Sequence, residues 1–273
     1  VSPQDTTWGP AASQYQNKLK VAEYVALNIP SASDDAVRNV LKNVTSTTDL
    51  STTQKIQTWV QSEQIDRTPK TLTLTPATDS LLGGQGNDVF TSDNSSGSMT
   101  LNVFDNLDGL GGTDLLKITD TSDTAFNLSA STGLSNIEQL SLQHSANDGT
   151  DTISLNVSHL NSLRSIAIQT GGTPTNTTIQ TRKNVDTVTI KNSGMLTITD
   201  QGMTDTLQSV SLENVQGNVT IASDALNTVT STDSNMHLTL NSSGISTALH
   251  ALSAIQQWTI VANGLTSLGV DLT

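Results

Sequence analysis

The residues with the clearest chemical pattern form a glycine-rich segment, Gly83-Gly-Gln-Gly-Asn-Asp-Val-Phe-Thr91. It matches the nonapeptide G-G-x-G-x-D-x-U-x at every fixed position, with Phe90 as the large apolar residue U. Glycines allow a tight turn that points backbone carbonyl oxygens inward, and Asp88 adds a hard anionic oxygen. Calcium typically binds about six to eight such oxygens, so the segment predicts a calcium-binding turn followed by a strand.

A second, less complete copy of this segment follows at an offset of 26 residues. The alignment pairs Asp79 with Asp105, Leu81 with Leu107, Gly83 with Gly109, Gly86 with Gly112, Asp88 with Asp114 and Phe90 with Leu116. The copy departs from the pattern at Leu110, where glycine is expected. Because the offset is close to the length of the repeat described below, we predict two glycine turns on successive coils with calcium between them.

The predicted metal ligands are carboxylates and backbone carbonyls of both turns, contributed by Asp79, Gly83, Gly84, Gly86, Asp88, Asp105, Asp108, Gly109, Gly112 and Asp114. Calcium is expected rather than zinc or magnesium, because the chain has no cysteine and its histidines are not clustered. Surface or turn positions are expected for the four histidines, His144, His159, His237 and His250. The alternative is that both glycine turns are metal-free corners that end coils.

Enzyme motifs are missing from the sequence. Without HExxH, GxSxG, GxGxxG or a P-loop, metalloprotease, hydrolase, dinucleotide-binding and NTPase activities have no support. Polysaccharide lyases built on parallel β-helices need basic residues and carboxylates in one groove. Beyond residue 71 the only basic residues are Lys117, Arg164, Arg182, Lys183 and Lys191. We therefore predict that the chain is not an enzyme.

The charge and composition narrow the possible partners. The formal net charge is −13, with 25 acidic and 12 basic residues, which argues against nucleic acid and anionic membranes as partners. The negative net charge fits a protein whose carboxylates are neutralised by divalent cations, and it fits an ordinary acidic surface equally well. No run approaches the roughly 18 apolar residues that span a bilayer. No signal peptide is visible after Val1, so we expect a processed product or a fragment, which also fits export through a C-terminal signal.

Residues 12–65 have the apolar spacing of helices. The first predicted helix places Leu19, Ala22, Val25 and Ala26 on one face, and Pro30 ends it. Ser33 is the expected N-cap of a second helix that carries Val37, Val40, Leu41 and Val44, and a third begins near residues 51–53 with Ile56, Trp59 and Val60. We expect these apolar residues to form a core. The pattern changes to alternation near residue 71, which divides the chain into a helical region, 1–68, and a second domain, 69–273.

A repeat of the form apolar-x-x-apolar-x-apolar predicts the fold of the second domain. It occurs at Ile137/Leu140/Leu142, Leu163/Ile166/Ile168, Val185/Val188/Ile190, Leu207/Val210/Leu212, Ile255/Trp258/Ile260 and Leu265/Leu268/Val270, with a weaker copy at Leu226/Val229/Ser231. A second alternating set lies between these strands, at Ile153/Leu155, Leu196/Ile198, Val219/Ile221 and Leu238/Leu240. A period of about 20 to 30 residues is typical of solenoids. We predict a mainly β protein, a right-handed parallel β-solenoid with the calcium turns at 79–117, preceded by the helical region.

The two turns, Gly83–Thr91 and Gly109–Lys117, resemble the calcium-binding repeats of RTX proteins, which are exported by type I secretion. The wider arrangement resembles the surface-layer (S-layer) proteins of that group, with the helix Asn17-Lys-Leu-Lys-Val-Ala-Glu-Tyr24, the two turns, and then coils rich in Thr, Ser and Asn. The specific match covers residues 79–117, and the chain has far fewer such turns than typical members. The resemblance implies that calcium folds the chain outside the cell and joins subunits into a lattice.

Two functions follow as hypotheses. The first is a structural, self-assembling subunit of a bacterial surface layer, or a segment of one, whose helical region anchors it, with other surface-layer subunits or cell-surface polysaccharide as partners. The second is a calcium-stiffened adhesin module that binds glycan or ice through an outward ladder of Thr and Ser. In that ladder Thr187/Thr189 fits the regular Thr-x-Thr pattern of ice binding, whereas Ser165/Ala167 breaks it. We favour the structural role, at the cell surface.

Overall fold

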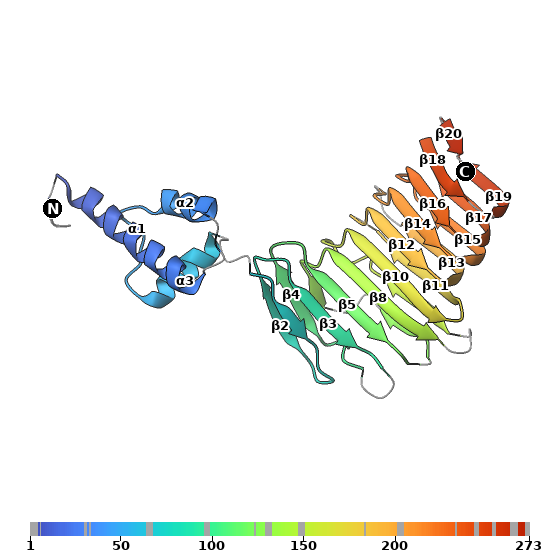
Figure 1. Cartoon of the computed structure of the whole chain (residues 1–273), viewed down its shortest axis with the longest axis horizontal. Coiled ribbons are helices and arrows are strands. Elements are labelled where there is room, and N and C mark those ends of the chain that lie inside the picture. The colour runs from blue at the N-terminus through green and yellow to red at the C-terminus, as the bar shows by residue number, and fades with distance from the viewer. Residues whose placement is uncertain are drawn as a thin grey trace. The chain divides into compact units, whose positions relative to one another are not determined.

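The structure is a computed structural model of the whole chain (Figure 1). It describes residues 5, 7–29, 32, 34–63, 68–95, 99–122, 124–128, 133–146, 151–182, 184–200, 205–232, 234–242, 246–252, 255–262 and 267–270. The chain forms two compact units. One is a helical unit, Val1–Lys70 together with Gly83–Asn87, and the other is a β unit, Thr71–Leu82 with Asp88–Thr273.

The helical unit contains three helices, α1 (Gly9–Asn28), α2 (Asp34–Asn43) and α3 (Thr53–Ser62). The side chain of Thr52 caps α3 by accepting a hydrogen bond from the backbone N–H of Lys55 (3.2 Å). The core of the unit consists of Val21, Val25, Ile29, Val40, Val44, Leu50 and Val60. Pro30 and Ser33, the predicted helix stop and N-cap, lie outside the described residues.

The predicted core face of α1 is partly wrong. Leu19 is 56% exposed and Ala26 is also exposed, whereas Val21 and Val25 are buried. Helical spacing identifies residues that share a face, but α2 and α3 cover only the side of α1 that carries Val21 and Val25. The apolar stripe that runs through Leu19 stays exposed.

The β unit is built from parallel strands in three sheets (Figure 1). The ten-stranded sheet contains, in order, β1 (Thr71–Thr73), β3 (Val89–Asp93), β5 (Leu115–Asp120), β8 (Gln139–Ala146), β10 (Ser165–Gly172), β12 (Thr187–Lys191), β14 (Ser209–Glu213), β16 (Thr228–Thr232), β18 (Ser246–Leu252) and β20 (Ser267–Val270). The seven-stranded sheet contains β6 (Phe126–Leu128), β9 (Thr152–Asn156), β11 (Thr175–Thr181), β13 (Ser193–Asp200), β15 (Gln216–Ala222), β17 (Asn235–Ser242) and β19 (Ile255–Ala262). The three-stranded sheet contains β2 (Ser80–Gly84), β4 (Asn106–Leu110) and β7 (Gly133–Ser135).

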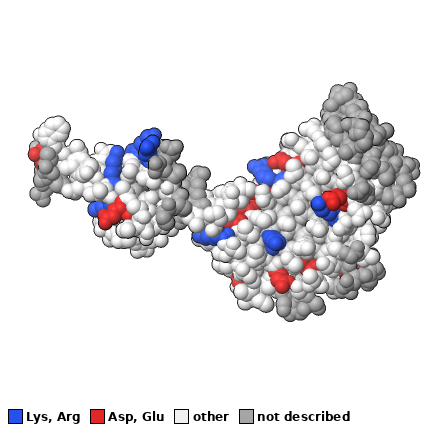
Figure 2. All heavy atoms as spheres, in the orientation of Figure 1, with Lys and Arg blue, Asp and Glu red and all other residues white. Residues whose placement is uncertain are grey.

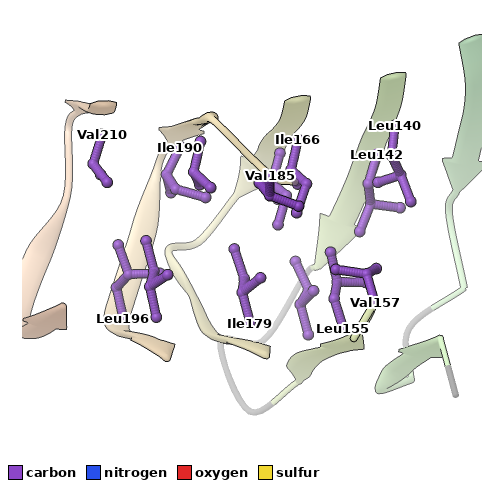
Figure 3. Packing of buried hydrophobic residues seen from close by; sticks show 14 of the residues in the cluster. Leu140, Leu142, Leu155, Val157, Ile166, Ile179, Val185, Ile190, Leu196 and Val210 are labelled. Atoms are coloured by element: carbon purple, nitrogen blue, oxygen red, sulfur yellow. The ribbon is translucent and has the colours of Figure 1, made fainter. Parts of the chain in front are cut away.

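The middle residues of the predicted repeat stack on one another. In the ten-stranded sheet Leu140 lies beside Ile166, Ile166 beside Val188, Val188 beside Val210, and Val210 beside Val229. All five are buried. Figure 3 shows Leu140, Ile166 and Val210 pointing into the space between the sheets, toward Leu155, Ile179 and Leu196. This arrangement confirms the predicted parallel β-solenoid, because each coil buries its apolar side chains only by stacking on its neighbours.

The last two copies of the predicted repeat do not stack as expected on the earlier ones. Trp258 lies in β19 of the seven-stranded sheet, beside Leu238, and Leu249 of β18 takes the place next to Val229. Farther on, Val270 pairs with Leu249, while Leu265 lies outside the described residues. Alternation has the same period in both sheets, so an apolar spacing alone does not say to which sheet a strand belongs.

Candidate cation-binding site

The two glycine turns lie on successive coils, with the alignment expected from their offset. β3 pairs with β5 so that Val89 lies beside Leu115 and Phe90 beside Leu116. At the corner before these strands, the backbone N–H of Asp88 donates a hydrogen bond to Oδ1 of Asp114 (2.7 Å). The offset of 26 residues between the turns is therefore the length of one coil.

The predicted ligands Asp79 and Asp105 act as hydrogen-bond acceptors for nearby polar groups. Asp79 accepts from the backbone N–H of Thr75 (2.7 Å) and from its hydroxyl (3.0 Å). Asp105 accepts from the backbone N–H groups of Asp79 (2.9 Å) and Asn102 (2.8 Å). All four carboxylate oxygens therefore have hydrogen-bond donors within the protein.

A column of three acidic residues stands at the other corner, where strands of the ten-stranded sheet begin. This acidic column consists of Asp88, Asp114 and Glu138, one from each of three successive coils. Just as Asp88 donates its N–H to Asp114, Asp114 donates its own N–H to Oε2 of Glu138 (2.8 Å). The sequence analysis missed Glu138, although Leu116 pairs with Leu140 in the sheet. That coil is 24 residues long, so a count from Leu140 would have placed Glu138 next to Asp114.

The second oxygen of the Asp114 carboxylate has no hydrogen-bond donor. Asp114 is completely buried, and its Oδ2 atom is a buried oxygen without a partner. A methyl group on Gly109 would lie 2.2 Å from this Oδ2 and 2.0 Å from the backbone carbonyl oxygen of Asn136. Only glycine fits there, because both acceptor oxygens pack directly against its Cα atom.

Two pairs of strands hold these oxygens in place. β4 pairs with β7, with Asp108 beside Ser135, so that Gly109 and Asn136 follow on neighbouring coils. β5 pairs with β8, with Leu115 beside Gln139, which sets Asp114 beside Glu138. The corner between the three-stranded and ten-stranded sheets thus fixes the site from both sides.

The electrostatic environment of Asp114 is unfavourable for its negative charge. The pKa of Asp114 is raised from its usual 3.8 to about 6. Burial is the largest cause, repulsion from Glu138, Asp88 and Asp108 also raises this pKa, and the hydrogen bond from the Asp88 N–H lowers it. A cation near Oδ2 would offset both the burial and the repulsion.

The remaining predicted residues of the second turn shape the backbone. Oδ1 of Asp108 accepts from the side-chain amide of Asn136 (2.7 Å) and from the N–H of Leu110 (3.0 Å). Leu110, the departure from the motif, has a φ of 67°, and Gly112 has a φ of 119°. The second turn therefore keeps a glycine-type conformation even where leucine replaces glycine.

In the first turn a lysine already contacts a predicted carbonyl ligand. The side-chain ammonium of Lys70 donates to the carbonyl oxygen of Gly83 (2.6 Å). Gly83 and Gly86 are buried and Gly84 is half-buried. At this carbonyl the positive charge that calcium would supply comes from the protein.

A buried histidine departs from the sequence expectation. His144 is fully buried, not at the surface, and its Nδ1 lies 2.9 Å from Oδ2 of the buried Asp120. Oδ1 of Asp120 also accepts from the N–H (3.0 Å) and the hydroxyl (2.5 Å) of Ser122. Burial raises the pKa of Asp120, but these hydrogen bonds outweigh it, so the pKa is lowered overall. Asp120 and His144 are 24 residues apart in the sequence, and their contact links two successive coils.

The donor set around Asp114 fits calcium better than a transition metal. Within the described part of the chain, no three His, Asp or Glu side chains form a group that would hold a metal by themselves. A site at Asp114 would combine one buried carboxylate oxygen with a backbone carbonyl, the neighbouring Glu138 and water. Calcium accepts such mixed oxygen ligands in flexible geometry.

Among the described helices, none has the length and apolar character needed to cross a membrane. Comparison of the chain with protein-family models, with curated proteins and with solved structures found no match.

Proposed function

We propose that this chain is a structural, calcium-dependent extracellular protein of the bacterial cell surface, an S-layer-type lattice subunit or a segment of one. Calcium is its cofactor, and other copies or other surface-layer subunits are its partners. The chain is proposed to have no enzymatic activity, and the resemblance to RTX surface-layer proteins gives the expected route of export, type I secretion.

The observation that carries this proposal is the buried, unpartnered Oδ2 of Asp114 at the stacked glycine turns. A buried carboxylate oxygen among other carboxylates is costly unless a cation compensates it. In a calcium-poor cytoplasm the first coils would be held apart by this repulsion. Outside the cell, calcium would order these coils, and they would template the rest of the solenoid.

The surface supports a protein partner rather than nucleic acid. On the face shown in Figure 2, Lys and Arg atoms lie in small scattered groups and form no continuous basic patch. With a net charge of −13, the chain has too little clustered positive charge for phosphate recognition. Divalent cations would also reduce repulsion between acidic copies in a lattice.

Electron microscopy of the purified chain tests the proposal. Samples are imaged in about millimolar calcium and in excess chelator, a range that covers weak extracellular calcium sites. We expect ordered sheets or extended arrays with calcium and dispersed particles with chelator. Dispersed particles under both conditions would contradict the lattice role.

An adhesin module is the second candidate, and one surface feature favours it. Small side chains align in register on the outer face of the ten-stranded sheet, at Ser141, Ala167, Thr189, Ser211 and Thr230. A shallow hollow of about 140 Å³ lies over part of this row, between Lys117 and Lys191. Thr259, at the equivalent position of the predicted repeat Ile255/Trp258/Ile260, belongs to β19 in the other sheet. Binding to a glycan array, or thermal hysteresis with ice, would favour this candidate over the lattice subunit.

A further inference from the structure

We propose that helix α1 pairs with α1 of a second copy of this chain, side by side and in the same direction, as a two-stranded coiled coil. The inference deepens the proposed function by naming a contact between copies, and it rests on that function only for the part this contact would play in a lattice. The surface concerned is the seam of α1, which begins at the N-cap residue of the helix and consists of Trp8, Ala12, Tyr15, Leu19, Ala22 and Ala26.

The seam has the residue spacing of a coiled coil. Its six members follow one another at alternating intervals of four and three residues. Apolar side chains at positions a and d of a seven-residue repeat form one stripe along a helix and pack into the matching stripe of a second helix. Leu19 falls at position a and Tyr15 at position d. The alternation holds along almost the whole of the 20-residue helix, which is about 30 Å long.

This seam lies on the side of α1 that its own unit leaves uncovered. Trp8 is 62% exposed, Tyr15 is 70% exposed and Leu19 is 56% exposed. The helix packs on α2 and α3 through a different face, which carries the buried Val21 and Val25. A row of large apolar side chains in contact with water marks a surface that binds another protein.

The charged residues beside the seam favour a second copy as the partner, in parallel orientation. Lys18 directly precedes Leu19 and falls at position g, and Glu23 directly follows Ala22 and falls at position e. In a parallel pair of identical helices, the residue at g lies near the residue five positions later on the other helix, so Lys18 of each copy meets Glu23 of the other. Two-fold symmetry forms this ion pair twice. In an antiparallel pair, Lys18 would lie near Lys18 of the other copy.

The distribution of charge along the chain also favours contact between helical units. Residues 1–70 contain seven basic and seven acidic residues, whereas residues 71–273 contain five basic and eighteen acidic ones. The whole net charge of −13 therefore lies in the β unit. Two copies repel each other through their β units and not through their helical units, so α1 can pair without calcium.

Sedimentation of the full chain in excess chelator tests the pairing, at protein concentrations from about 1 µM to about 0.5 mM. Leu19→Glu places a charge in the middle of the seam. The matched control is Leu27→Glu, which adds the same charge to the same helix at a leucine that is 75% exposed and lies outside the seam. We expect the parent to dimerise with a Kd of about 10–100 µM, Leu19→Glu to dimerise at least about tenfold more weakly, and Leu27→Glu to match the parent. Circular dichroism checks that both variants keep their helices.

A charge exchange tests the parallel orientation. In Lys18→Glu, two glutamates meet at each of the two former ion pairs, so we expect the dimer to weaken about tenfold. The double variant Lys18→Glu/Glu23→Lys restores opposite charges, and we expect its Kd to lie within about twofold of the parent value. A Lys18→Glu variant that dimerises as tightly as the parent would overturn the parallel arrangement.

The outcomes separate the pairing from the proposed function. A parent that stays monomeric at every concentration, or equal weakening by Leu19→Glu and Leu27→Glu, would overturn the pairing, while calcium-dependent arrays in electron microscopy would still support the lattice role. A dimer in chelator that depends on Leu19, together with no arrays in calcium, would support the pairing and contradict the lattice role.

Discussion

Asp88 and Asp114 are 26 residues apart in the chain, yet the backbone N–H of Asp88 donates a 2.7 Å hydrogen bond to the side chain of Asp114. The contact joins two coils through a backbone donor and a charged acceptor, which is stronger than a bond between neutral groups. It uses one oxygen of the Asp114 carboxylate and leaves the other, Oδ2, buried without a donor. The same residue thus links the two coils and carries a buried oxygen that is left without a donor.

The pH dependence of stability in calcium-free buffer follows from the raised pKa of Asp114. This pKa is about 6 in the folded chain, whereas the usual value for this side chain is 3.8, so between these pH values the folded state binds the proton more tightly than the unfolded state does. Raising the pH from about 4 to 6 should therefore destabilise the fold, by up to about 3 kcal/mol, with no further loss from this group above that range. Urea unfolding at several pH values measures the effect. A parent that shows the same pH dependence as Asp114→Asn would contradict it.

Replacing Leu110 by glycine should stabilise the β unit. Leu110 has a φ of 67° and is 40% exposed, so glycine relieves backbone strain at little loss of buried surface. After the larger unfolded-state entropy of glycine is subtracted, we expect a gain of about 0.5–1 kcal/mol in the free energy of unfolding. Leu82→Gly is the control, because Leu82 is 60% exposed in β2 and has no positive φ. Leu82→Gly should lower the free energy of unfolding of the β unit. If Leu110→Gly lowers it as well, the strain argument is contradicted.

Much of the solenoid could be predicted from sequence, because apolar alternation directly reports which side chains face inward. The stacking of Ile166, Val188 and Val210 follows from that pattern. The pattern fails at Trp258, because strands of both sheets share the same alternation and the preceding coil lacks a strong repeat. It also leaves Leu19 on the wrong side of a helix, because helical spacing does not reveal which face its neighbours cover.

Polar residues of the site were harder to predict than the core. The motif identified Asp88 and Asp114, whose spacing equals a coil length. Glu138 has no motif around it, and its role appears only when the register of β8 against β5 is known. His144 was expected at the surface, because a lone polar residue in a sequence carries no sign of a buried partner such as Asp120.

Breaking the buried pair of Asp120 and His144 should strongly destabilise the solenoid. In Asp120→Ala the imidazole loses its 2.9 Å partner in a fully buried position, and removing one partner of a buried pair costs about 3–5 kcal/mol. Glu213→Ala, which breaks the half-exposed pair with Lys191, should cost less than about 1 kcal/mol. Chemical unfolding compares the two variants. Equal, small losses would show that the buried pair contributes little.

The central claim, that calcium compensates the buried charge of Asp114, is tested most directly by thermal unfolding of Asp114→Asn with and without calcium. Asparagine keeps an oxygen that can accept from the Asp88 N–H, and its amide can donate to the Asn136 carbonyl. In chelator we therefore expect the variant to melt at a higher temperature than the parent. Calcium at 100 times its dissociation constant should stabilise the parent by about 2.7 kcal/mol and leave the variant unchanged. A variant that melts below the parent in chelator and still gains the full calcium stabilisation would contradict the account.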